Sequence, residues 1–334
     1  MKKHIYIYSP SGAVRDKAAF KRGVTRLKTL GHEVEVDEAA LASHLRFAGD
    51  DDTRLAAIHR AAASGADMAM ISRGGYGLTR ILGGINYKAV AKSIDKGTHF
   101  VGFSDFTALS LALMAKTGQA TWAGPALIDD FGVGEKAIEP DGHGPIAALV
   151  PDDIMEDCFN DLICGQGEGT GWRQHPEGTP NAIDSVAGYA LPEGVPGTFH
   201  VKNGLLWGGN LAVLCALVGT PYLPPVKGGI LFLEDVGEHP YRVERMLTQL
   251  LMAGVLAKQK AIVLGQFTGF KLGPHDKGFK LQSVVNWLRS QLKIPVLTNL
   301  PFGHVPTKVL LPVGKKVEML VQGRDVMLVW GHLG

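Results

Sequence analysis

Strand-like and helix-like segments alternate through the first half of this chain. The strand-like segments are 5–8, 33–36, 68–71 and 100–103, and helix-like stretches lie at about 16–30 and 51–64. This alternation predicts a parallel β-sheet covered by helices, in a Rossmann-like arrangement. In such sheets, ligands bind beyond the carboxyl ends of the strands. The loops that follow these strands are therefore the first candidates for a functional site.

The composition changes between residues 165 and 197, where glycine, proline and polar residues dominate. A chain of 334 residues is longer than a typical single domain. We therefore expect an N-terminal α/β domain at 1–164, a linker at 165–197 and a C-terminal mixed α/β domain at 198–334. Strand-like segments of the second half lie at 229–233, 261–264, 295–297 and 317–320, and helix-like ones at about 211–218, 241–253 and 281–292.

The composition excludes several classes of protein. The formal net charge is only +2, which argues against a nucleic-acid-binding surface. No apolar stretch approaches the roughly 20 residues that span a bilayer, and the N-terminus has too few apolar residues for a signal peptide. The three cysteines, Cys158, Cys164 and Cys215, cannot all pair, so we expect reduced thiols and a cytoplasmic protein. No His/Cys/Asp spacing predicts a metal, and no other cofactor is expected.

One of the candidate loops displays a serine. The sequence from 101 to 109 reads VGFSDFTAL, in which an apolar run stops at a glycine, presents Ser104 and resumes as a helix-like stretch. A serine at a sharp strand-to-helix turn points its hydroxyl out of the fold, and the next N–H lies at a helix N-terminus, where developing negative charge is favoured. Two interpretations remain open, because Ser104 is either a nucleophile or, like Asp105, a candidate helix cap. The turn also lacks the second glycine of the G-x-S-x-G elbow.

A glycine-rich loop follows the strand at 68–71. Its sequence, RGGYG at 73–77, lets backbone N–H groups come close to a ligand. It lacks the GK[ST] ending of a P-loop and the spacing of the dinucleotide fingerprint, which argues against a phosphate site. An oxyanion cradle and a simple tight turn both fit the pattern.

A serine nucleophile needs a base, a carboxylate that orients the base, and donors for the oxyanion. Glu234 ends the apolar run at 229–233, where it is either the exit of a strand into water or the partner of a histidine. Of the 12 histidines, His304 stands out because Pro301 and Gly303 hold the turn that carries it.

With these residues assembled, the chain resembles the LD-carboxypeptidase family of serine peptidases, which includes the microcin-immunity-type peptidases. The motifs that carry the resemblance occur in the expected order over most of the chain. They are SPSG at 9–12, RGGYGLTRIL at 73–82, GFSDFTAL at 102–109, GGNL at 208–211, GILFLEDVGEHPYRVERML at 229–247 and PFGHVPTKVLLPVG at 301–314. The chain departs mildly from the family pattern, with Glu244 where Asp is expected and Thr307 where Asn is common.

The resemblance implies a catalytic triad of Ser104, Glu234 and His304, the residues that the local patterns single out. It also implies an oxyanion hole formed by the backbone N–H groups of Asp105 and Gly75, with Gly74 as the alternative to Gly75. Other polar residues of these motifs stay open as shapers of the site or as ligands of the substrate carboxylate: Arg73, Tyr76, Arg80, Asn210 and Arg245.

The activity implied by the resemblance is that of a muramoyltetrapeptide carboxypeptidase. Such an enzyme releases the terminal D-alanine of a murein tetrapeptide or related muropeptide in cytoplasmic peptidoglycan recycling, by cutting the bond between the L-centre of diaminopimelate and D-alanine. The resemblance further implies a two-domain fold, with the nucleophile in the first domain and Glu and His in the second, and often a homodimer. One alternative is a microcin-immunity-type hydrolase of peptide–nucleotide amides, and another is a non-catalytic α/β protein that binds a small anion.

Overall fold

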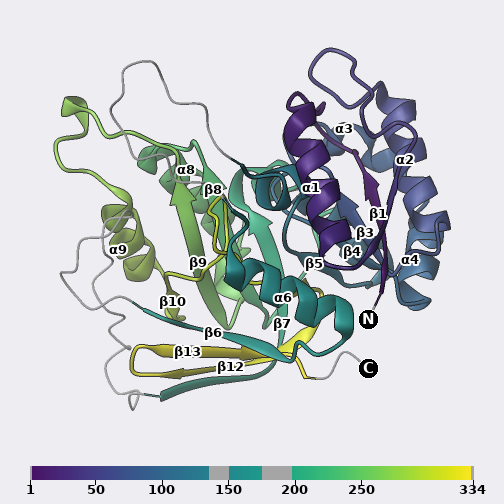
Figure 1. The fold of residues 1–334 in the computed structure, drawn as a ribbon. Helices are drawn as coiled ribbons and strands as arrows, with labels where there is room; N and C mark the ends of the chain where they lie inside the picture. Colours follow the sequence, from purple (N-terminus) through teal and green to yellow (C-terminus); the bar gives the residue numbers. More distant parts are fainter. Residues whose placement is uncertain (1, 135–149, 175–197, 332–334) are drawn as a thin grey trace.

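The computed structural model describes residues 2–134, 150–174 and 198–331 (Figure 1). Helices flank two separate β-sheets, one of six strands and one of seven. The first sheet is built mainly from the N-terminal half of the chain, and the second mainly from the C-terminal half. The predicted class, a two-domain α/β protein, is confirmed.

The first sheet has the strand order β11-β5-β4-β3-β1-β2. Its strands from β5 to β2 are parallel, whereas β11 runs antiparallel to β5. The parallel arrangement agrees with the alternation of strands and helices in the sequence. The strand bounds are β1 His4–Tyr8, β2 Glu33–Val36, β3 Met68–Ile71, β4 His99–Gly102, β5 Thr121–Ala123 and β11 Leu311–Val313.

Helices cover both faces of this sheet because successive side chains of a strand point to opposite faces. Ile5 and Ile7 pack into a core with α1, α6 and a π-helical turn, whereas Tyr6 and Tyr8 pack into another with α2, α3, α4 and α5. The bounds are α1 Lys17–Thr29, α2 Asp51–Ala63, α3 Leu78–Ile81, α4 Tyr87–Asp95, α5 Phe106–Thr117, the π-helical turn Leu127–Phe131 and α6 Asp153–Cys164.

The second sheet has the order β10-β9-β8-β7-β12-β13-β6. Its strands from β10 to β7 are parallel and those from β7 to β6 are antiparallel, so this sheet is mixed. The strand bounds are β6 Gly169–Arg173, β7 Thr198–Asn210, β8 Ile230–Val236, β9 Ala261–Thr268, β10 Val296–Leu297, β12 Lys316–Gln322 and β13 Asp325–Val329. The α-helices of this domain are α7 Leu211–Ala216, α8 Pro240–Met252 and α9 Leu281–Gln291.

Two strands depart from a simple division at a linker of residues 165–197. Strand β6 lies inside that range and pairs with β13, so the first part of the expected linker belongs to the second sheet. Strand β11, at 311–313, crosses back and pairs with β5 of the first sheet. Residues 175–197 lie outside the described residues, and the boundaries at 164 and 197 stay a prediction.

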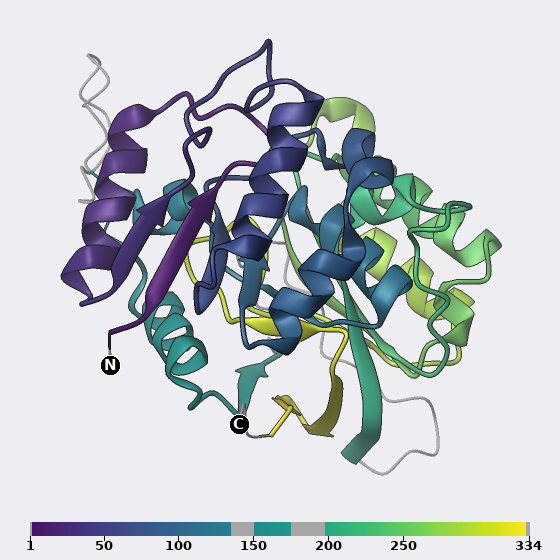
Figure 2. The ribbon, with the colours of Figure 1, turned by 90° about the vertical axis from the view of Figure 1, so that its right-hand side faces the viewer.

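The two domains meet along α5 of the first and the end of β7 of the second. The Asn210 backbone N–H donates to Thr107 Oγ1 at 3.0 Å, and a side chain at Gly209 would come within 2.5 Å of the same oxygen. Figure 2 shows the N-terminal helices and strands in front, with the green helices of the second domain at the right. One buried apolar cluster contains residues of both domains, so they share a core.

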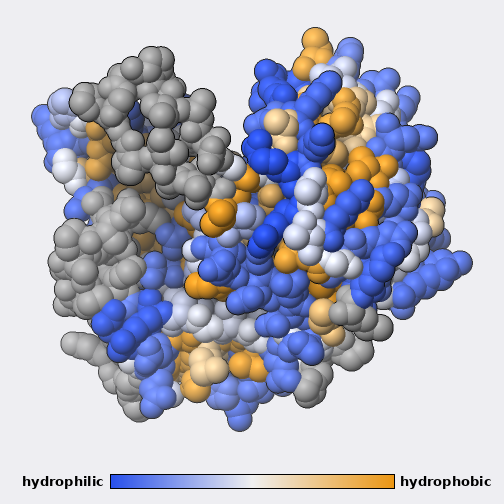
Figure 3. All heavy atoms as spheres, in the orientation of Figure 1, coloured by the Kyte–Doolittle hydropathy of each residue, from blue (hydrophilic) through white to orange (hydrophobic). Residues whose placement is uncertain are grey.

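The surface seen in Figure 3 is mostly hydrophilic, with apolar side chains in small groups. Within the described ranges, no helix is both long enough and apolar enough to cross a bilayer.

Candidate active site

Ser104 lies on a strained turn between β4 and α5. Its φ is +61°, a left-handed conformation that serine rarely adopts. The cap residue of α5 is Asp105, whose side chain makes no capping hydrogen bond to the helix. Its carboxylate instead accepts the Leu78 backbone N–H at 2.9 Å. The helix-cap interpretation of this turn is therefore not favoured, and the strain is typical of a residue held in place for function.

The loops that follow β1, β3 and β4 converge at one edge of the first sheet. The Gly12 N–H donates to the Gly74 carbonyl at 3.2 Å, which joins the loop after β1 to the glycine-rich loop. A Cβ at Gly74 would lie 2.7 Å from Ser104 Cβ and 2.8 Å from Ser104 Oγ. Only glycine fits so close to the serine. Within the described residues, neither the Asp105 N–H nor the Gly75 N–H donates a hydrogen bond, so both are available to a ligand.

Glu234 and His304 form a direct pair. Glu234 lies near the end of β8, and its Oε2 is 2.8 Å from His304 Nδ1. Because a carboxylate can only accept here, Nδ1 carries the proton and Nε2 is left as the basic nitrogen. Burial lowers the pKa of His304, but the hydrogen bond and charge of Glu234 outweigh it, so the pKa lies above its ordinary value. The Glu234 side chain is only 1% exposed, whereas that of His304 is 21% exposed.

Asn210, which is also hydrogen-bonded to Asp235, holds the Glu234 side chain of this pair. Asn210 Nδ2 donates to Glu234 Oε1 at 3.2 Å and to Asp235 Oδ1 at 3.0 Å. Burial and the neighbouring charge of Glu234 raise the pKa of Asp235 to about 6. Asn210 thus fixes the orientation of the glutamate, a role that its motif GGNL does not reveal.

The turn that carries Ser104 and the turn that carries His304 meet through an aromatic contact. The Phe103 ring, directly before Ser104, lies with its centroid 4.8 Å from that of His304. No hydrogen bond joins Ser104 to His304 in the part of the chain that the structure describes. The structure thus brings Glu234 and His304 into contact and places them beside the Ser104 turn. The assignment of the three as a triad stays a prediction.

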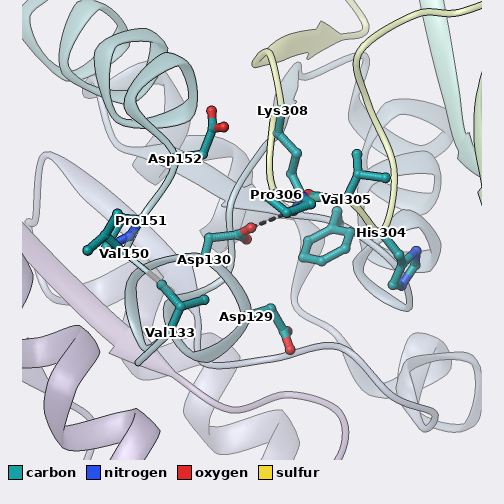
Figure 4. Close-up of a pocket in the computed structure, with 11 residues that line it drawn as sticks. Asp129, Asp130, Val133, Val150, Pro151, Asp152, His304, Val305, Pro306 and Lys308 are labelled. Atoms are coloured by element: carbon teal, nitrogen blue, oxygen red, sulfur yellow. Dashed lines mark hydrogen bonds and ion pairs between the residues drawn. The ribbon is translucent and has the colours of Figure 1, made fainter. Parts of the chain in front are cut away.

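A cavity of about 280 Å³ adjoins His304. Figure 4 shows Lys308 extending toward Asp130, with His304 to one side and Asp129 below. Neighbouring protein groups partly desolvate Asp129 and raise its pKa, although its side chain is exposed to the cavity and the charges of Arg73, Lys308 and His304 act in the opposite direction. Sequence patterns did not identify Asp129, Asp130 or Lys308, because none of them belongs to a spacing with a known chemistry.

The three arginines left open by the sequence have different surroundings. Arg73 donates from its guanidinium to the Ala13 carbonyl at 3.1 Å, beside the loops around Ser104. Arg80 pairs with Asp51 at 3.1 Å, and Arg245 lies exposed on α8. Arg73 is therefore the arginine at the candidate site. Across the described ranges, no group of three His, Cys, Asp or Glu side chains is arranged to hold a metal ion.

Comparisons with known families give matches in both halves of the chain. Residues 5–124 match the family model described as the LD-carboxypeptidase N-terminal domain. Residues 203–319 match the LD-carboxypeptidase C-terminal domain.

Individual relatives extend these matches. A probable murein peptide carboxypeptidase of Bacillus subtilis is 30% identical over 294 residues, which cover 88% of this chain and 81% of that protein. The microcin C7 self-immunity protein of Escherichia coli is 26% identical over 286 residues, 79% of this chain and 74% of that protein. The crystal structure of a muramoyltetrapeptide carboxypeptidase from Oxalobacter formigenes matches with a TM-score of 0.78 and 36% identity, over 98% of each chain.

Proposed function

This chain belongs to the LD-carboxypeptidase family, and we propose that it is a serine carboxypeptidase that releases the terminal D-alanine of a murein tetrapeptide by hydrolysing an L,D-peptide bond. The observation that carries the proposal is the 2.8 Å contact between His304 Nδ1 and Glu234 Oε2, made beside the strained turn of Ser104. The substrate class follows from the murein peptide carboxypeptidases among its relatives.

In the first half of the proposed reaction, His304 Nε2 takes the proton of Ser104 Oγ while Oγ attacks the scissile carbonyl carbon. The Glu234 carboxylate holds Nδ1–H and stabilises the imidazolium that forms. The imidazolium then protonates the D-alanine nitrogen as the C–N bond breaks, which leaves an ester on Ser104. In the second half, His304 deprotonates a water that attacks this ester, and the proton returns to Ser104.

The developing oxyanion lies in this proposal between the N–H of Asp105 and that of Gly75, with Gly74 as the alternative. Asp105 starts α5, so the partial positive charge of the helix N-terminus adds to its N–H. The hydrogen bond from Leu78 N–H to the Asp105 side chain keeps the two loops together. The donors are thus fixed before substrate binds.

Arg73 is the proposed ligand of the D-alanine carboxylate. It lies two residues after the end of β3, on the loop that contacts Ser104 through Gly74. A guanidinium is suited to a carboxylate because it presents paired N–H donors in a fixed plane. A substrate held there has its terminal residue beside the nucleophile.

Asp129 is the proposed ligand of an ammonium group on the penultimate residue. Its carboxylate lines the cavity next to His304 and makes no hydrogen bond or ion pair with another described residue. The other carboxylates of the cavity have partners, because Asp130 pairs with Lys308 and Asp152 accepts the Thr307 hydroxyl at 2.7 Å. Diaminopimelate carries a side-chain ammonium that fits this position.

A cytoplasmic location and a homodimer, both implied by the family resemblance, belong to the same proposal. The likeness to the microcin C7 self-immunity protein favours a second candidate substrate class, the peptide–nucleotide amides. A panel of both substrates separates the two, and light scattering of the purified protein measures the oligomeric state.

The decisive experiment follows D-alanine release from murein tetrapeptide by mass spectrometry. The parent protein is compared with Ser104→Ala and His304→Ala, and we expect both variants to lose nearly all turnover. If these variants release D-alanine as fast as the parent, the triad is wrong. If the parent cleaves only peptide–nucleotide amides, the substrate class is wrong and the triad stands.

A further inference from the structure

Lys308 lies four residues after His304 and contacts three separate parts of the site. Its Nζ forms a buried ion pair with Asp130 and donates to the Val305 carbonyl at 2.7 Å. The same Nζ lies 4.6 Å from the centre of the Phe103 ring. The side chains of Lys308 and Asp130 are only 3% and 1% exposed.

These contacts cross the boundary between the two domains. Asp130 belongs to the π-helical turn of the first domain and is held by the Ala126 N–H at 2.8 Å. Phe103 precedes the nucleophile and packs on the His304 ring, and Val305 follows His304. The Lys308 ammonium group therefore contacts the turn that carries His304, the residue before Ser104, and the π-helical turn of the first domain.

We infer that Lys308, with Asp130 as its counter-ion, is a positioning residue that holds the His304 turn of the second domain against the Ser104 turn of the first. The inference rests on the proposed triad and extends it. A buried ion pair is weak evidence for stability, because desolvation opposes the attraction of the charges. The geometry instead suits alignment, since catalytic groups must be held within about 0.5 Å of the productive arrangement.

The charge of Lys308 also acts on the base that it positions. Charged groups reach His304 from three directions: Glu234 from β8, Asp129 from the π-helical turn and Lys308 from its own turn. Burial lowers the pKa of His304. Glu234 and Asp129 raise this pKa, whereas Lys308 lowers it. Lys308 thus keeps more of His304 in the neutral form that accepts a proton. Burial raises the pKa of Asp130 to about 6, so its carboxylate is mostly charged only above that pH.

The test measures how fast a fluorophosphonate probe labels Ser104, as a function of pH. Labelling needs the base and the nucleophile but not the natural substrate, so it reports on alignment even if the proposed substrate is wrong. The variants are Lys308→Met, the double variant Asp130→Asn/Lys308→Met, which leaves no unpaired buried carboxylate, and Lys308→Arg, which keeps the charge.

We expect Lys308→Met and the double variant to be labelled about 10- to 100-fold more slowly than the parent, as a small misplacement of reacting groups produces. In both, the acid limb of the pH profile moves to higher pH, because the charge that lowers the pKa of His304 is gone. Lys308→Arg keeps the acid limb of the parent. A purely structural lysine would lower the melting temperature without moving this limb.

The matched control is Arg26→Met/Glu156→Gln, which removes another ion pair, between α1 and α6, whose residues do not line the cavity beside His304. It should lower the melting temperature and leave the labelling rate and the acid limb at parental values. A double variant at 130 and 308 with the parental rate and limb would overturn the inference. A parent protein whose Ser104 is not labelled would overturn the triad and this inference with it.

Discussion

His304 Nδ1 lies 2.8 Å from Glu234 Oε2, and both residues belong to the second domain. The proposed base and its orienting carboxylate are therefore assembled within one domain, on the end of a buried strand and a proline–glycine turn. Ser104 is supplied by the other domain, on a turn whose strain the surrounding loops maintain. In the proposed mechanism, activity thus depends on how the domains dock as well as on the pair itself.

Glu234→Gln tests the electrostatic part of this pair. The amide no longer carries the charge that stabilises the imidazolium, so we expect kcat to fall about 10⁴-fold with little change in KM. Activity requires neutral His304 and is lost as pH falls through its pKa. Because Glu234 raises that pKa, the acid limb of the kcat profile should move to lower pH in the variant. Glu318→Gln, on the exposed side of β12, is the control, and a kcat of Glu234→Gln within threefold of it would contradict the assignment.

Ser104→Ala and Ser104→Gly test whether the turn is strained. Both variants lack the hydroxyl, so we expect both to lose about 10⁴- to 10⁶-fold in turnover. Glycine adopts a φ of +61° without strain, so Ser104→Gly should exceed Ser104→Ala in free energy of unfolding by about 1 kcal/mol, as measured in urea.

The opposite order is expected at Ser290, an exposed residue of α9. There, the free energy of unfolding of Ser290→Gly should be about 0.5–1 kcal/mol lower than that of Ser290→Ala, because the backbone is helical. Equal stabilities for the two variants at position 104 would show that the turn is not strained.

The sequence reveals the parts of this site that depend on local structure. The Ser104 turn, the end of β8 and the turn before His304 lie where the patterns of apolar residues, glycine and proline indicate them. Lys308 and Asp130 are 178 residues apart, and only the docking of the domains brings them together. The sequence does not predict the crossing of β11 to the first sheet for the same reason. A three-residue strand has no periodicity that identifies its partner strand.

Gly74→Ala tests the close approach of the glycine-rich loop to the nucleophile. The new methyl group would lie 2.7 Å from Ser104 Cβ, so the loop or the serine must move. We expect kcat/KM to fall at least about 100-fold, since oxyanion donors and nucleophile lose their spacing. Gly83→Ala is the matched control, because its methyl group would meet its nearest neighbour, Tyr222 Oη, at 3.6 Å. Equal activity of the two variants would separate this loop from catalysis.

Asp129→Asn tests how the protein recognises the penultimate residue of the substrate. If Asp129 holds the ammonium of diaminopimelate, loss of its charge should raise KM about 10-fold for the tetrapeptide, in line with a charge-assisted hydrogen bond worth about 1.5 kcal/mol. A tetrapeptide with that amine acetylated carries no ammonium on its penultimate residue, so parent and variant should cleave it with equal KM. Both constants are measured by D-alanine release. An equal rise of KM for both peptides would mean that Asp129 shapes the cavity without binding the amine, and the ammonium would then have to be held elsewhere.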